Sequence, residues 1–163
     1  MSILNQTVSN YPAIRDLVPH RDPMVLLDEV LFADAESLCA AVKICRDSPF
    51  FDSEAEGVGA WVGIEYMAQA IAAHAGYLAR AKGETVKVGF LLGTRRFETK
   101  TPRFTLGSNL HIQVHCSLQS ENGLGAFECH IVDSTASEHI LASATITVFQ
   151  PDNAEQFLKG QAM

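Results

Sequence analysis

The stretch Trp61-Val-Gly-Ile-Glu-Tyr-Met-Ala-Gln-Ala-Ile-Ala-Ala-His-Ala-Gly-Tyr-Leu78 decides the fold of this chain. It is apolar almost all round and rich in Gly and Ala, which is typical of a central helix that other elements surround. Its length approaches the roughly 20 residues that a bilayer requires. Glu65, Gln69 and His74 would then lie in hydrocarbon, and no second apolar span follows to cover them. We therefore predict a buried helix and no membrane span.

Composition is that of a single globular domain. The chain has 163 residues, and we expect one domain over residues 1–150 and a polar C-terminal tail over residues 151–163. The net charge of −7 argues against binding to nucleic acids and to anionic membranes. The N-terminus lacks the features of a signal peptide, so we expect a cytoplasmic protein. Four cysteines without metal-type spacing are expected to be reduced and mostly buried: Cys39, Cys45, Cys116 and Cys129.

The remaining sequence predicts mainly antiparallel strands. Apolar and polar residues alternate from Leu110 to Leu118, which is typical of a half-buried strand, and Asn122-Gly123 predicts a hairpin turn after it. Further strands are expected at 24–32, 38–45, 86–92, 127–131 and 140–149, with a short helix at 11–18. The predicted fold class is α+β, one antiparallel sheet that curls around one long central helix. The outer face of this sheet is half apolar or small, so we expect a second subunit.

Glu65 is the strongest candidate for chemistry, because a carboxylate among apolar neighbours needs a partner, a proton or a catalytic role. Gln69 lies one helical turn further on, where its amide can orient the carboxylate and face a substrate. Gly57, Gly59 and Gly63 are expected at the helix start. They either let a thioester carbonyl approach free backbone N–H groups or simply allow close contact between a strand and the helix.

Four histidines differ in their suitability for a catalytic or metal site. His20 lies between two prolines, which fix the position of its backbone. His74 lies about half a turn around the helix from the carboxylate, so we expect a core or interface histidine. His111 and His115 share one face of a strand with Gln113, but a metal site there would need two further ligands. We therefore expect no metal.

Three motifs resemble those of the β-hydroxyacyl-acyl-carrier-protein dehydratases. Val18-Pro-His-Arg-Asp-Pro-Met-Val-Leu-Leu-Asp28 resembles their Leu-Pro-His-Arg-Tyr-Pro opening, Pro49-Phe-Phe51 their Pro-Phe-Phe, and Ile64-Glu-Tyr-Met-Ala-Gln69 their Ile-Glu-Ala-Met-Ala-Gln helix. The resemblance covers nearly all of the expected domain and implies the hot-dog fold, whose protomers dimerise sheet beside sheet. Together with Gly89-Phe-Leu-Leu-Gly-Thr-Arg-Arg96, the helix is most similar to the dehydratase-like subgroup of aryl polyene biosynthesis.

The resemblance implies roles for two residues. In that family a loop histidine from the partner subunit takes the C2 proton of a 3-hydroxyacyl thioester, and a helix Glu protonates the leaving hydroxyl. Glu65 matches that Glu and is expected to face an acyl tunnel. The family histidine stands in Gly-His-Phe-Pro, whereas this chain has Asp52-Ser-Glu-Ala-Glu-Gly57. His20 is the best replacement as base, since the matching family segment borders the tunnel. No cofactor is implied.

Three functions remain open at this point. The first is dehydration of (3R)-3-hydroxyacyl thioesters on acyl carrier protein to trans-2-enoyl thioesters, in fatty-acid or polyene-type synthesis. The second is an acyl thioesterase, and the third is a non-catalytic subunit. Expected partners are acyl carrier protein and, in a homodimer or heterodimer, a second hot-dog dehydratase. A carrier protein is acidic, so Arg95, Arg96 and Lys100 are candidates for docking it, unless they are only solvated turn residues.

Overall fold

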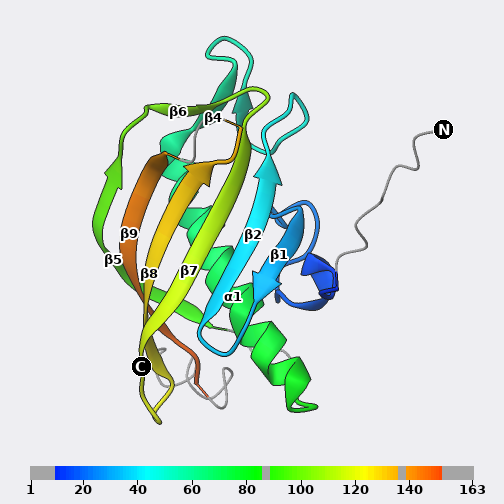
Figure 1. Ribbon diagram of the computed structural model, residues 1–163, viewed down its shortest axis with the longest axis vertical. Helices are drawn as coiled ribbons and strands as arrows, with labels where there is room; N and C mark the ends of the chain where they lie inside the picture. The colour runs from blue at the N-terminus through cyan, green and yellow to red at the C-terminus, as the bar shows by residue number, and fades with distance from the viewer. Residues whose placement is uncertain (1–9, 86–88, 136–138, 152–163) are drawn as a thin grey trace, which may run out of the picture.

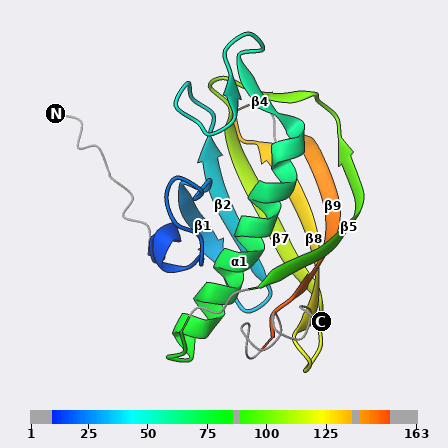
Figure 2. The ribbon, with the colours of Figure 1, turned by 180° about the vertical axis from the view of Figure 1, so that it is seen from behind.

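The computed structural model describes residues 10–85, 89–135 and 139–151. One long helix, α1 (Gly63–Ala81), lies against the concave face of a six-stranded antiparallel sheet (Figures 1 and 2). In spatial order the strands are β1 (Glu29–Ala33), β2 (Ser37–Lys43), β7 (Asn109–Gln119), β8 (Leu124–Asp133), β9 (Ile140–Phe149) and β5 (Phe90–Thr99). The sequence-based prediction of a sheet around one central helix is confirmed, and the fold is the hot dog.

A second, small sheet lies near the start of α1. It has three strands, β3 (Phe51–Asp52), β4 (Gly57–Gly59) and β6 (Arg103–Thr105), and the sequence did not predict it. Strands of two or three residues are too short to produce a readable alternation of apolar and polar side chains. Single turns of 3-10 helix occur at Ile14–Asp16, within the expected N-terminal helix, and at Ala60–Val62, directly before α1.

The C-terminal end of α1 follows from the local sequence. Gly83 adopts φ +71, a conformation that favours glycine, and its N–H donates to the carbonyl of Arg80. The helix therefore ends at Ala81, directly before Lys82 and Gly83. No helix in the described part of the chain is long and apolar enough to cross a membrane.

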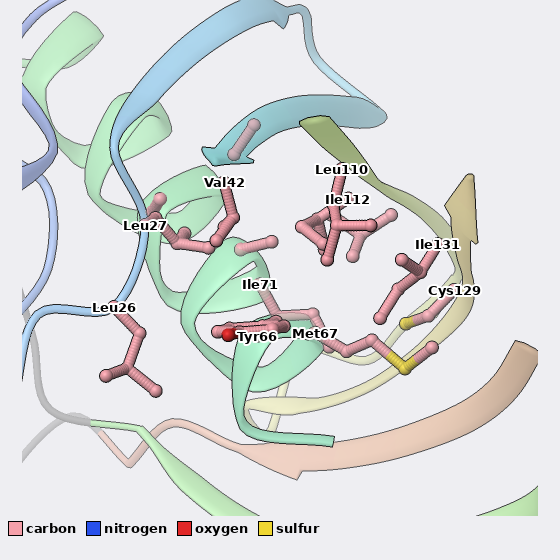
Figure 3. Close-up of a cluster of buried hydrophobic side chains, with 14 of the residues drawn as sticks. Leu26, Leu27, Val42, Tyr66, Met67, Ile71, Leu110, Ile112, Cys129 and Ile131 are labelled. Atoms are coloured by element: carbon pink, nitrogen blue, oxygen red, sulfur yellow. The ribbon is translucent and has the colours of Figure 1, made fainter. Parts of the chain in front are cut away.

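The core forms between α1 and the inner face of the sheet (Figure 3). Met67 and Ile71 of α1 contact a layer to which β7 contributes Leu110 and Ile112, each of them almost completely buried. Burial of such a side chain stabilises the fold by about 1.5–3 kcal/mol. The alternation predicted for 110–118 therefore places Leu110, Ile112 and Val114 in the core. It fails at the end of the strand, where Leu118 is exposed after a bulge that follows Cys116.

The four cysteines are free, as expected, but only Cys129 is buried. Burial raises the pKa of its thiol to about 12, with a smaller contribution from the charge of Glu128. Cys45 is exposed in the loop after β2, and Cys39 is partly exposed because it points to the outer face of the sheet. The expectation that most of the thiols are buried is therefore wrong.

Two strands differ from their predicted bounds. The first begins at Glu29 and not at Met24, although the N–H of Asp28 already donates to the carbonyl of Ala41 in β2. The strand expected at 86–92 continues through Gly93 and Arg96 to the end of β5, and 86–88 lie outside the described residues. Leu91 and Leu92 are 47% and 54% exposed instead of buried, because β5 forms an edge of the sheet and has only β9 beside it. The tail from residue 152 onward lies outside the described residues as well.

His74 is a core histidine, as the sequence indicated. Its side chain is buried, its ring lies edge-on to that of Phe127, and its Nε2 lies 3.0 Å from the carbonyl oxygen of Asp34. Since a carbonyl can only accept, Nε2 carries the proton and donates it. Burial lowers the pKa of His74, against a smaller raising effect of Asp34, because an imidazolium in the core is poorly solvated.

We expect His74 to make the protein less stable at mildly acidic pH. A base whose folded pKa is lowered contributes stability above its unfolded pKa and loses it as pH falls below that value. Between pH 7 and 5.5 the free energy of unfolding should fall by about 1 kcal/mol from this residue alone. Urea unfolding should show the fall in wild type and in the exposed-site control His139→Gln, but not in His74→Gln. An equal fall in all three proteins would contradict the assignment.

Candidate active site

Glu65 lies in the first turn of α1, and its side chain is 40% exposed. The expectation of a sequestered carboxylate is therefore wrong for the single protomer. The sheet covers one side of α1, whereas the face that carries Glu65, Ala68 and Ala72 is only partly covered. The carboxylate thus stands at the open side of the helix, where a substrate or a second subunit can reach it.

Gln69 holds the carboxylate in place. Its Nε2 donates to Glu65 Oε1 over 3.1 Å and to the carbonyl of Met24 over 2.7 Å, while its Oε1 accepts from the N–H of Leu26 over 2.9 Å. The expected hydrogen bond to the carboxylate is present. A direct contact with substrate is not possible, because Gln69 is completely buried and its amide is occupied. The two backbone partners could not be foreseen, since backbone atoms leave no signature in a sequence.

His20 is the histidine that lies beside this carboxylate. Its Nε2 is 3.7 Å from Glu65 Oε1, which is too long for a hydrogen bond, and its side chain is 30% exposed. Its Nδ1 is buried and has no hydrogen-bond partner among the described residues. No hydrogen bond within the described part of the chain therefore fixes which ring nitrogen of His20 carries the proton.

An open hollow of about 460 Å³ adjoins His20. Its lining comes from the N-terminal segment and includes Arg21 and the ion pair Arg15–Asp22, whose Nε and Oδ2 atoms are 3.0 Å apart. Glu65 is not part of the lining. The tunnel expected beside Glu65 is therefore not enclosed by the described residues of one chain, because the open face of α1 lacks a cover.

The glycines near the start of α1 allow close packing and do not all lie at the helix N-terminus. Gly57 and Gly59 belong to β4 and pair with β6, so the expectation that they form the helix N-terminus is wrong. A Cβ on Gly57 would lie 2.5 Å from the carbonyl oxygen of Phe104. Gly63 does begin α1, but a Cβ there would lie 3.0 Å from Ile131 Cδ1. The alternative of close strand-to-helix contact thus accounts for Gly63, whereas Gly57 allows close contact between two strands, β4 and β6.

Three further histidines point away from the site. His111, His115 and His130 alternate with core residues of β7 and β8 and therefore face the outer side of the sheet. The Oγ of Ser37 lies 2.7 Å from His115 Nδ1. Across the described ranges, no three His, Cys, Asp or Glu side chains come together in a way that could hold a metal ion.

The basic residues singled out for docking lie on and just after the edge strand. Arg95 and Arg96 belong to β5, Lys100 follows it, and all three side chains are exposed. They are therefore strand residues more than turn residues, although Arg96 takes φ +53 at a bulge of the strand. Glu98 lies between them and reduces the positive charge of the patch.

A comparison with protein families identifies the chain. Residues 12–159 match the model of the ApeP-like family, described as ApeP dehydratase. The chain belongs to the ApeP-like dehydratase family. A chain of the dehydratase heterocomplex ApeI:P from Xenorhabdus doucetiae is 32% identical, with a TM-score of 0.83 over 91% of this chain and 97% of that chain. The resemblance seen in the sequence is therefore confirmed.

More distant relatives of this ApeP-like chain are dehydratases and thioesterases. The 3-hydroxyacyl-[acyl-carrier-protein] dehydratase FabZ of Staphylococcus saprophyticus is 34% identical over 47 residues, which are 28% of this chain and 32% of that protein. FabZ of Staphylococcus carnosus is 36% identical over 47 residues, with the same coverage of both proteins. The match thus spans about a third of these curated relatives. A hypothetical thioesterase from Streptococcus pneumoniae, solved with coenzyme A, is 14% identical with a TM-score of 0.59 over 75% of this chain and 84% of that one, which shows the shared fold alone.

Proposed function

We propose that this ApeP-like protein dehydrates (3R)-3-hydroxyacyl thioesters, carried by an acyl carrier protein, to trans-2-enoyl thioesters. The observation that carries the proposal is the pair of Glu65 and His20, 3.7 Å apart at the open face of α1. Elimination of water from such a substrate requires a base at C2 and an acid at the 3-hydroxyl. A histidine and a glutamate placed side by side supply both groups.

The proton transfers balance as follows. His20 Nε2 takes the C2 proton, and the electron pair of that bond forms the C2–C3 double bond. The C3–O bond breaks towards its oxygen, which takes the proton of the Glu65 carboxyl group and leaves as water. The proton on His20 then returns to Glu65 and resets the pair. N–H groups of the first turn of α1, which begins at Gly63, are proposed to polarise the thioester carbonyl.

A second subunit is proposed to cover the site. The partly exposed Glu65 and the edge position of β5 favour a partner that completes a tunnel along α1. The similar chain from Xenorhabdus doucetiae belongs to a dehydratase heterocomplex, which favours a heterodimer with a second hot-dog dehydratase over a homodimer. Synthesis of fatty-acid or polyene-type chains in the cytoplasm is the proposed setting.

Product analysis tests the proposed reaction. The purified chain, alone and with a second hot-dog dehydratase, is given a 3-hydroxyacyl pantetheine thioester and then the same acyl group on a carrier protein. We expect a conjugated enoyl thioester, which absorbs in the ultraviolet, and no free thiol. Release of thiol would instead establish a thioesterase. Turnover that the second dehydratase shows equally well without this chain would establish a non-catalytic subunit.

Arg95, Arg96 and Lys100 are proposed to dock the acidic carrier protein. Reversal of Arg95 and Arg96 to Glu should lower kcat/KM for carrier-bound substrate about tenfold at low salt, because a favourable charge pattern that speeds encounter becomes repulsive. Turnover of the pantetheine thioester should stay unchanged. An equal loss on both substrates in steady-state assays would contradict docking and indicate damage to the site or to β5.

A further inference from the structure

The two proposed proton-transfer groups come from one chain in this structure. Resting on the function proposed above, we infer that each protomer supplies both Glu65 and His20 to the same site, so that the site works in cis. The N-terminal segment thereby does what a loop of a second subunit would otherwise do. A second subunit covers the site without contributing the histidine.

The first contact that carries this inference is the amide of Gln69. It bonds Glu65 on its own helix and, across a separation of more than forty residues, both Met24 O and Leu26 N of the segment that carries His20. The N–H of Leu26 fixes the direction of the amide, because it can only donate to Oε1. One buried side chain therefore positions the carboxylate and the histidine segment relative to each other.

The second contact lies on the other side of His20. Leu17 is completely buried, and its backbone approaches α1 so closely that a Cβ on Gly76 would lie 1.9 Å from its carbonyl oxygen. Val18 is buried as well. His20 is thus held between two attachment points on the helix that bears Glu65, and the 3.7 Å separation is a property of the packed chain.

The other histidines offer no equal candidate for a group supplied by a partner. The chain has six. His74 lies in the core with its Nε2 bonded, and three face the outer side of the sheet, leaving His139, which is exposed directly before β9. The loop between β2 and β4, over residues 44–56, contains none. In an assembly of two copies of this chain, a mechanism in trans would therefore depend on His20 leaving its attached position or on His139.

Subunit mixing tests the inference. Glu65→Gln and His20→Ala chains are co-expressed with different affinity tags, and doubly tagged assemblies are isolated. A site in cis predicts no more activity than either variant alone, whereas a site in trans restores one intact site of two, about half of wild type. Assemblies of wild type with the Glu65→Gln/His20→Ala double variant reverse the expectation: about half for cis and none for trans.

A heterodimer with one copy of this chain gives an equally sharp result. In cis, the double variant loses no more activity than either single variant, because each already disables the same site. In trans, the two losses lie in different sites and add. His139→Ala is the matched control and should keep full activity, and a loss there would overturn the inference, because His139 and not His20 would then be the required histidine. Full activity of both single variants would refute the proposed function itself, an outcome distinct from the others.

Discussion

Replacement of Glu65 by glutamine is expected to lower kcat about a thousandfold, in line with the loss of a positioned general acid. Gln has nearly the same shape, and its carbonyl oxygen can still accept the hydrogen bond from Gln69 Nε2, which now reaches Glu65 Oε1 over 3.1 Å. What disappears is the proton that the leaving hydroxyl requires. The ultraviolet absorbance of the enoyl thioester measures the effect, and KM should change little because the carboxylate acts in the transition state.

Glu128→Gln is the matched control for this change. Glu128 is also a partly exposed carboxylate that a side chain bonds, since it accepts from Thr145 Oγ1, but it lies on the outer face of the sheet. It should keep full activity. Both variants should melt within about 2 °C of wild type, since neither changes a buried contact. Normal turnover in Glu65→Gln would remove this residue from the reaction and with it the proposed mechanism.

Replacement of Gly76 by alanine should lower the free energy of unfolding more than any other proposed substitution. The added Cβ would lie 1.9 Å from the carbonyl oxygen and 2.7 Å from the carbonyl carbon of Leu17, so the N-terminal segment must move off α1. The higher helix propensity of alanine returns about 1 kcal/mol. We expect a net destabilisation of about 3 kcal/mol, and hence a Tm lower by about 6–12 °C for a chain of this size.

Activity should fall together with stability in this variant, because the displaced segment carries His20. Gly93→Ala provides the comparison: no atom lies within 4 Å of a Cβ at that position, so its Tm should stay within about 1 °C of wild type. Calorimetry measures both proteins. A Gly76→Ala protein as stable as wild type would show that the segment is not held against the helix in solution.

The periodicity of apolar residues made the fold predictable. The edges of the sheet and its short strands could not be predicted in this way. The alternation predicts the inner face of β7 correctly from Leu110 to Val114, and the apolar helix likewise packs in the core. The apolar run that contains Leu91 and Leu92 predicted a buried strand. A run of apolar residues looks the same in a sequence whether it lies inside a sheet or at its edge. The sequence likewise placed Gly57 and Gly59 at the helix start, because the close approach of β6 depends on residues distant in the chain.

The site was predictable in its residues more than in its surroundings. Glu65 stood out as a charge among apolar neighbours, and the resemblance to dehydratases pointed to His20, which lies next to it. The exposure of the Glu65 carboxylate depends on what covers the open face of α1. The sequence of this chain contains no information about a covering subunit that is a different protein. The hydrogen bonds of Gln69 to Met24 and Leu26 are tertiary contacts with backbone atoms, which no local pattern announces.

The free edge of β5 has a practical consequence for producing the protein. No strand of the described ranges pairs with its outer side, where Leu91 and Leu92 are exposed, so strands of other molecules can add to this edge. Expression of this chain alone should therefore yield mostly insoluble protein, and co-expression with the proposed partner subunit should raise the soluble yield.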